Sequence, residues 1–118
     1  MIVLVEDNDD IRESMQEFLL SLGHRVEVAG DGEAGLALIL RLKPDVALVD
    51  VGLPTLDGYQ VAERVRQVLD RSTVRLVALT GYGQESDRRR TQEAGFDAHL
   101  VKPAEMDALI DVLSSRGT

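Results

Sequence analysis

Short apolar runs alternate along this chain with longer stretches in which apolar residues recur at helical spacing. The runs have the length of strands and are rich in β-branched residues. The expected strands are Ile2–Val5, Arg25–Ala29, Val46–Val49, Val74–Leu79 and Ala98–Val101. The stretches that follow them predict the helices Asp9–Leu22, Gly32–Leu42, Gly58–Leu69, Gln84–Ala94 and Ala104–Ser115.

Strict alternation of strand and helix predicts a parallel sheet, because parallel neighbours need a crossover that a helix can provide. Right-handed crossovers then place helices on both faces. The expected fold class is therefore α/β, with a doubly wound five-stranded parallel sheet.

Composition narrows the class of protein. The 118 residues contain no internal repeat or linker, so we expect residues 1–118 to form a single domain. The net charge of −8 argues against nucleic acid or an anionic membrane as a direct partner. The chain has no cysteine, no apolar run long enough to cross a membrane and no recognisable secretion signal, so we expect a cytoplasmic location.

Chemically reactive side chains follow four of the expected strands, at the point where each strand ends. These residues are Glu6 and Asp7, then Asp50, then Thr80 and Gly81, and finally Lys102 and Pro103. Because the carboxyl ends of parallel strands meet at one edge of the sheet, we expect these groups to share a site. Carboxylates held so close together repel one another unless a cation compensates, so the acids predict a metal site.

Each of these groups suits one part of phosphoryl transfer. Carboxylates with retained waters are the usual ligands of Mg²⁺, and an Asp carboxylate can also form an aspartyl phosphate. A hydroxyl and an ammonium can bind the phosphoryl oxygens. Lys102 stands out because eleven of the thirteen basic residues are Arg and Lys43 is the other Lys.

Five short motifs resemble, in order and over essentially the whole chain, those of response-regulator receiver domains, the phosphoacceptor modules of two-component signalling. The motifs are Leu4–Asn8, Leu48–Pro54, Leu56–Gly58, Ala78–Gly81 and Leu100–Pro103. The resemblance implies the flavodoxin-like (βα)5 fold with strand order 2-1-3-4-5. The sequence of residues 95–103 further resembles that of receiver domains attached to hybrid histidine kinases.

The resemblance implies that Asp50 accepts a phosphoryl group from a sensor histidine kinase or a histidine phosphotransfer protein. Asp7, Asp50 and the backbone carbonyl of Gly52 would ligate Mg²⁺, with Glu6 acting mainly through water. Gly52 and Tyr82 would flank the path of the water that hydrolyses the phosphate. Such a domain is a switch with at most self-catalysed phosphotransfer and autodephosphorylation, and is not an enzyme in the ordinary sense.

The resemblance also implies that Thr80 and Lys102 bind phosphoryl oxygens beside Gly81, and that the peptide bond before Pro103 is cis. Phosphorylation would switch a protein-interaction surface made by the fourth helix, fifth strand and fifth helix. Phosphorylation-linked homodimers are common in the family.

His99 departs from the commoner family pattern, in which a Tyr or Phe swings inward on phosphorylation. Imidazole can fill that role, yet a lone His is more often a neutral, satisfied side chain, so both interpretations stay open. The arginine run at residues 88–90 can likewise dock an acidic partner or form a solvated face, and we favour the solvated face.

Other acids are better explained as helix starts than as ligands. Asp9 and Asp10 can cap the first helix, and Asp10 has capping-box spacing to Glu13. Asp57 with Gly58 predicts a turn and the entry to the third helix.

Three other functions fit parts of the pattern. A phosphatase of the haloacid dehalogenase type would carry an acid two positions after the nucleophile, where this chain has Gly52. A flavin or nucleotide module would need a phosphate loop after the first strand, where Glu6 and Asp7 would repel phosphate. An interaction module that is never phosphorylated is the third alternative.

Overall fold

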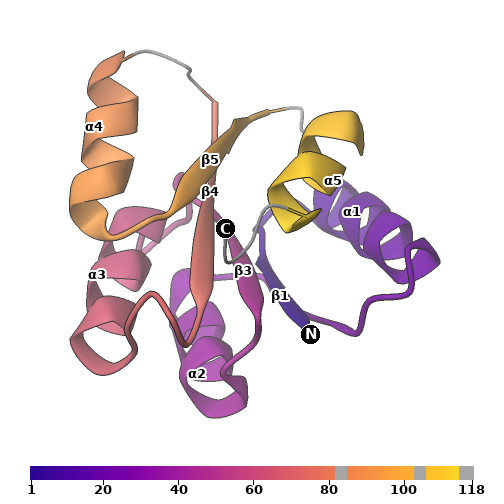
Figure 1. Ribbon diagram of the computed structural model, residues 1–118, viewed down its shortest axis with the longest axis horizontal. Coiled ribbons are helices and arrows are strands. Elements are labelled where there is room, and N and C mark those ends of the chain that lie inside the picture. Colours follow the sequence, from indigo (N-terminus) through magenta and orange to yellow (C-terminus); the bar gives the residue numbers. More distant parts are fainter. Residues whose placement is uncertain (82–84, 103–105, 115–118) are drawn as a thin grey trace.

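The computed structural model describes residues 1–81, 85–102 and 106–114, which form a sheet covered by helices (Figure 1). The strands are β1 (Ile2–Val5), β2 (Val26–Ala29), β3 (Val46–Asp50), β4 (Arg75–Thr80) and β5 (Ala98–Val101). The helices are α1 (Asp9–Ser21), α2 (Gly32–Leu42), α3 (Gly58–Val68), α4 (Glu85–Ala94) and α5 (Met106–Ser114). All ten predicted elements are confirmed; three of the predicted helix ends, Gln84, Ala104 and Ser115, lie outside the described residues.

The strands form one parallel sheet in the order β2-β1-β3-β4-β5, which confirms the predicted topology. The strand order reverses between β1 and β3, which pair directly, with Val5 opposite Val49. Open α/β sheets bind their ligands at such a switch point, beyond the carboxyl ends of the strands. The register therefore brings the residues that follow Val5 and Val49 next to each other.

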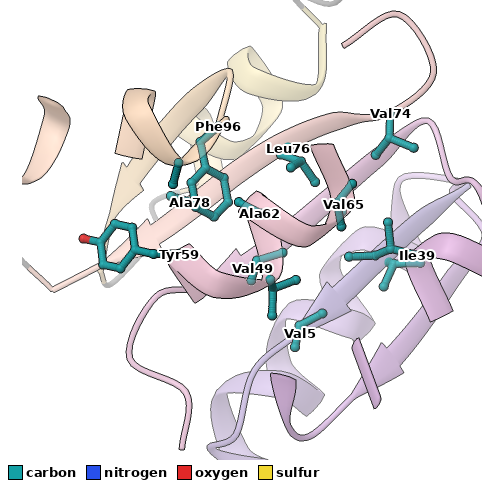
Figure 2. Close-up of a cluster of buried hydrophobic side chains, with 14 of the residues drawn as sticks. Val5, Ile39, Val49, Tyr59, Ala62, Val65, Val74, Leu76, Ala78 and Phe96 are labelled. Carbon is teal, nitrogen blue, oxygen red and sulfur yellow. The ribbon is translucent and has the colours of Figure 1, made fainter. Parts of the chain in front are cut away.

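The sheet is buried on both faces, and alternate strand residues belong to two separate apolar clusters. The larger cluster lies under α2, α3 and α4 and includes Val5, Ile39, Val49, Val65, Leu76 and Phe96 (Figure 2). The other lies under α1 and α5 and includes Ile2, Leu4, Leu19, Leu48, Leu79 and Leu109. Within the described parts of the chain, no helix combines the length and apolar character needed to cross a bilayer.

Helix α1 begins differently from the prediction. Asn8 is the N-cap, and its side-chain oxygen accepts a hydrogen bond from the backbone N–H of Ile11 at 3.0 Å. Asp9 and Asp10 lie one step later, in the first turn, where their charge still favours the helix dipole. The proposed cap at these acids, with its box from Asp10 to Glu13, is therefore wrong, because an N-cap needs non-helical backbone.

Helix α3 begins as predicted, directly against the end of β3. Asp57 and Gln60 form a capping box, with their side chains accepting hydrogen bonds from each other's backbone N–H at 2.9 and 3.0 Å. A Cβ on Gly58 would lie 2.4 Å from the carbonyl oxygen of Asp50 and 2.6 Å from the Cα of Val51. Only glycine allows the helix to start so close to Asp50.

Candidate functional site

Four of the predicted site residues meet at the carboxyl edge of the sheet, at the ends of β1, β3 and β5. Carboxylate oxygens of Glu6, Asp7 and Asp50 lie within 4.8 Å of one another. The Nζ of Lys102 lies 2.6 Å from Oε1 of Glu6 and 2.8 Å from Oδ2 of Asp50. We call these four residues the acidic site, since it gathers three acids and one ammonium.

Glu6 is the least satisfied member of the acidic site. Its side chain is fully buried, whereas Asp7 is exposed. Its Oε2 accepts a hydrogen bond of 3.3 Å from the backbone N–H of Asn8. Its Oε1 pairs with Lys102 by charge, but the direction of approach is not that of a hydrogen bond, and no other described residue donates to it. A buried carboxylate in this condition favours an added cation.

The shared environment moves the pKa values in different directions. Burial raises the pKa of Glu6, and the neighbouring Asp50 adds to the effect, against the pull of Lys102. Burial would also raise the pKa of Asp50, but hydrogen bonds from Lys102 and from the N–H of Gly52 help to outweigh it, and the pKa is lowered. The carboxylates overcome burial at Lys102 and raise its pKa. The lowered pKa keeps Asp50 ionised at neutral pH.

The loop after β3 holds Asp50 in place. The backbone N–H of Gly52 donates to Oδ1 of Asp50 at 2.9 Å, while Lys102 donates to Oδ2 at 2.8 Å. The N–H of Val51 continues the ladder to the carbonyl of Leu79 at 3.0 Å. Both carboxylate oxygens are thus oriented by donors. The predicted role of the Gly52 carbonyl as a metal ligand stays a prediction.

The neighbouring strand ends bring the other predicted residues to the same edge. Thr80 is buried, and its carbonyl accepts a hydrogen bond of 2.7 Å from the backbone N–H of Lys102. Gly81 is exposed, and a Cβ there would meet nothing within 4 Å, so the chain leaves open space beside Thr80. Tyr82 and Pro103, and hence the predicted cis bond, lie outside the described residues.

His99 lies on β5, the strand that precedes Lys102, and the arginine run lies on α4. His99 is half-buried, and burial together with the charge of Arg88 lowers its pKa, so the imidazole is neutral at pH 7. Residues 88–90 are exposed, in agreement with a solvated face. Arg90 has a second role, since its guanidinium carbon lies 4.0 Å from the ring centre of Tyr59 and ties α4 to α3.

Sequence reasoning missed Arg12. Its Nη1 donates to the backbone carbonyl of Glu6 at 2.9 Å, and its Nη2 pairs with the carboxylate of Asp9. The helical spacing of Asp9 and Arg12 is visible in the sequence and permits an ion pair. The bond to Glu6 is a tertiary contact that no local pattern signals.

Comparison with known proteins agrees with this geometry. A model of the response regulator receiver domain matches residues 2–114. The chain belongs to this family. Receiver domains are the phosphoacceptor switch domains of two-component phosphorelays, and the chain is such a domain.

Relatives of the receiver domain include much longer proteins. The transcriptional regulatory protein AfsQ1 of Streptomyces coelicolor is 35% identical over 119 residues, which cover 98% of this chain and 52% of that protein. The sensor histidine kinase RcsC of Salmonella typhi is 33% identical over 97% of this chain and 12% of its own length. The chain thus spans about half of the first relative and a small part of the second.

Solved structures confirm the predicted fold. The receiver domain of the sensor histidine kinase PA1611 from Pseudomonas aeruginosa has a TM-score of 0.86 at 34% identity, over 95% of this chain and 92% of that one. That structure has a magnesium ion coordinated in its active site cleft. The chemotaxis protein CheY4 of Vibrio cholerae has a TM-score of 0.87 at 28% identity, over 95% and 93% of the two chains.

Proposed function

We propose that this receiver domain accepts a phosphoryl group onto Asp50 from the phosphohistidine of a sensor histidine kinase or a histidine phosphotransfer protein. The acidic site carries the proposal. Asp50 is buried with a lowered pKa and oriented oxygens, and it lies next to two acids and Lys102. Phosphoryl transfer to a carboxylate requires a nucleophilic carboxylate, oxygen ligands for a metal ion and a positive charge near the phosphoryl group. The three acids and Lys102 provide these groups.

The donor set also fits Mg²⁺. Hard carboxylate oxygens converge from Glu6, Asp7 and Asp50, and the buried Oε1 of Glu6 lacks a well-directed donor among the described residues. Asp7, Asp50 and the Gly52 carbonyl would hold the ion, with Glu6 acting through water. A bound Mg²⁺ would neutralise charge on the phosphoryl group. The magnesium ion in the similar PA1611 receiver domain supports this assignment.

In the transfer step, a carboxylate oxygen of Asp50 forms the new bond to phosphorus as the bond to the donor imidazole nitrogen breaks. The imidazole leaves with the electron pair of that bond. Lys102 and Thr80 bind the phosphoryl oxygens, with Gly81 leaving room beside them. Hydrolysis of the product would be self-catalysed, with water approaching past Gly52 and Tyr82.

The signal would leave through the surface of α4, β5 and α5, with His99 as the candidate switch residue. A homodimer linked to phosphorylation is one form that this output can take. The domain would occupy residues 1–118, work in the cytoplasm and need no direct contact with nucleic acid or membrane. The family match over residues 2–114 and the net charge of −8 support this part of the proposal.

Incubation with acetyl phosphate and Mg²⁺, followed by intact mass measurement, tests the proposal. We expect one phosphate adduct on the wild type and none on Asp50→Asn. Asp10→Asn is the matched control, because Asp10 is an exposed acid of the α1 first turn and should leave the adduct unchanged. An undiminished adduct on Asp50→Asn, or no adduct on the wild type, would sink the proposal.

A further inference from the structure

Arg12 ties together three segments that meet beside the acidic site. From α1, its Nη1 donates to the carbonyl of Glu6 at 2.9 Å and its Nη2 pairs with Asp9. The guanidinium also lies against the turn between β2 and α2, where a Cβ on Gly30 would come within 3.3 Å of Nη1. Only 20% of the side chain is exposed, so Arg12 is a held side chain rather than a free surface cation.

The bond from Arg12 acts on the peptide unit that joins the first two acids. Glu6 is the first residue beyond β1, and its N–H still reaches the carbonyl of Ala29 at 3.1 Å. Its carbonyl belongs to the planar unit that continues into Asp7. A donor that fixes this carbonyl therefore fixes the plane between Glu6 and Asp7, and with it the directions in which both side chains leave the backbone.

We propose that Arg12 is a positioning residue for the acidic site, which orients the Glu6–Asp7 peptide so that both carboxylates converge on a divalent cation. This inference rests on the proposed function, because the cation site is the same. The fork of the guanidinium matters, since one donor holds Glu6 while the other is anchored on Asp9. A lysine ammonium offers a point charge without that fixed geometry.

The charge of Arg12 and its positioning role have opposite effects on cation binding. A positive charge near the acidic site repels Mg²⁺, so simple loss of charge would tighten binding. Loss of the bond to Glu6 would instead loosen the ligand geometry and weaken binding. The sign of the change in affinity therefore separates the two roles.

The experiment measures Mg²⁺ binding to the metal-free chain by isothermal titration calorimetry. We expect Arg12→Met to weaken Mg²⁺ binding about tenfold, the lower end of what outer ligand supports contribute, and Arg12→Lys to weaken it less. Arg71→Met is the control, because Arg71 also pairs with a carboxylate, Asp97, at 2.7 Å but lies at the other edge of the sheet. The amide resonance of Asp7 in metal-free protein should move in both Arg12 variants and stay in the control.

Urea unfolding of each variant shows whether the titrated protein is folded. Unchanged or tighter Mg²⁺ binding by folded Arg12→Met would overturn the positioning role, and so would a loss of stability with no change in affinity. Failure of the wild type itself to bind Mg²⁺ would overturn the proposed metal site and this inference together, so the two failures can be told apart.

Discussion

Two clusters of buried charge lie at opposite edges of the sheet, and their polar groups are satisfied to different degrees. In the acidic site, at the carboxyl edge, one ammonium serves two buried carboxylates and Glu6 lacks a well-directed donor among the described residues. At the amino edge, Arg66 of α3 forms an ion pair with one carboxylate, that of Asp97 before β5. We call Arg66, Asp97 and their partners the arginine cluster.

The guanidinium of Arg66 donates to groups from two connections of the fold, the one between α3 and β4 and the one between α4 and β5. Its Nε donates to the carbonyl of Gly95 at 2.9 Å, after α4. Its Nη1 donates to the carbonyls of Asp70 and Val74 at 3.0 and 2.8 Å, between α3 and β4. Its Nη2 donates to Oδ2 of Asp97 at 2.7 Å. One side chain thus fastens the helix ends to the sheet.

Asp97 is satisfied as fully as its partner. Its Oδ2 also accepts from the backbone N–H of Leu76 at 2.9 Å, and its Oδ1 accepts from Arg71 at 2.7 Å. Gly95 has φ of 109°, and a Cβ there would lie 2.5 Å from Cγ of Arg66, so glycine both ends α4 and admits the arginine. The comparison teaches that matched donors and acceptors make a structural cluster, whereas a surplus of carboxylates makes a binding site.

The largest expected effect is at the arginine cluster. Arg66→Met should lower the free energy of unfolding by about 3 kcal/mol, because Asp97 and three carbonyls all lose the donor that Arg66 provides. Urea unfolding at neutral pH measures it. Arg71→Met is the control; this side chain is 58% exposed, so its loss should be below about 1 kcal/mol. Equal losses in the two variants would remove the distinction between buried and exposed partners.

The next effect is at the acidic site. Lys102→Met should lower the free energy of unfolding of the metal-free chain by about 2 kcal/mol, since two carboxylates lose their common partner. Added Mg²⁺ should restore part of the lost free energy of unfolding in Lys102→Met. It should not do so in Arg66→Met. Lys43→Met, at the other and exposed lysine, controls for loss of a positive charge. A loss that Mg²⁺ leaves unchanged would contradict the idea that a cation replaces the ammonium.

A smaller effect of opposite sign is expected at Glu6. Glu6→Gln should raise the free energy of unfolding of metal-free protein by about 1 kcal/mol at pH 7, because it removes a buried charge that repels Asp50. The same variant should bind Mg²⁺ more weakly in calorimetry. Glu13→Gln, on the exposed side of α1, should change neither quantity. Destabilisation by Glu6→Gln would show that its pairing with Lys102 outweighs the repulsion.

The smallest expected effect is the pH dependence of the stability that Glu6→Gln gains. Burial raises the pKa of Glu6, so ionisation of Glu6 costs stability in the folded state. The cost is absent below the ordinary Glu pKa of about 4.3, where the group is protonated folded and unfolded, and it grows as pH rises. The advantage of Glu6→Gln should therefore shrink from pH 7 to about pH 4 in urea unfolding.

Asp50 should show the reverse pH dependence. Its pKa is lowered, so its contribution to stability is present above the ordinary Asp pKa of about 3.9 and is lost as pH falls through the folded value. Asp50→Asn, compared with the wild type over the same pH range, isolates this contribution. Parallel pH profiles for the Glu6 and Asp50 variants would contradict the opposite pKa directions.

The sequence by itself determined the elements, the class of fold and the members of the acidic site. Apolar periodicity is a local signal, so the strands could be predicted from the sequence. Because the carboxyl ends of all strands in a parallel sheet lie at the same edge, Glu6 and Asp50 could also be predicted to lie close together. The capping of α3 by Asp57 was equally local. Asn8 was missed at α1 because several neighbouring residues can cap and the backbone decides which one does.

Only the tertiary structure decided how each charge is satisfied. Arg12 on the Glu6 carbonyl, Arg66 among distant carbonyls and the opposite pKa directions of Glu6 and Asp50 depend on donors from other segments. Such contacts join residues far apart in the chain and leave no periodic trace in it. The sequence therefore names the groups at the carboxyl edge of the sheet, while burial and hydrogen-bond geometry reveal the arginine cluster and decide which edge is a scaffold and which is a site.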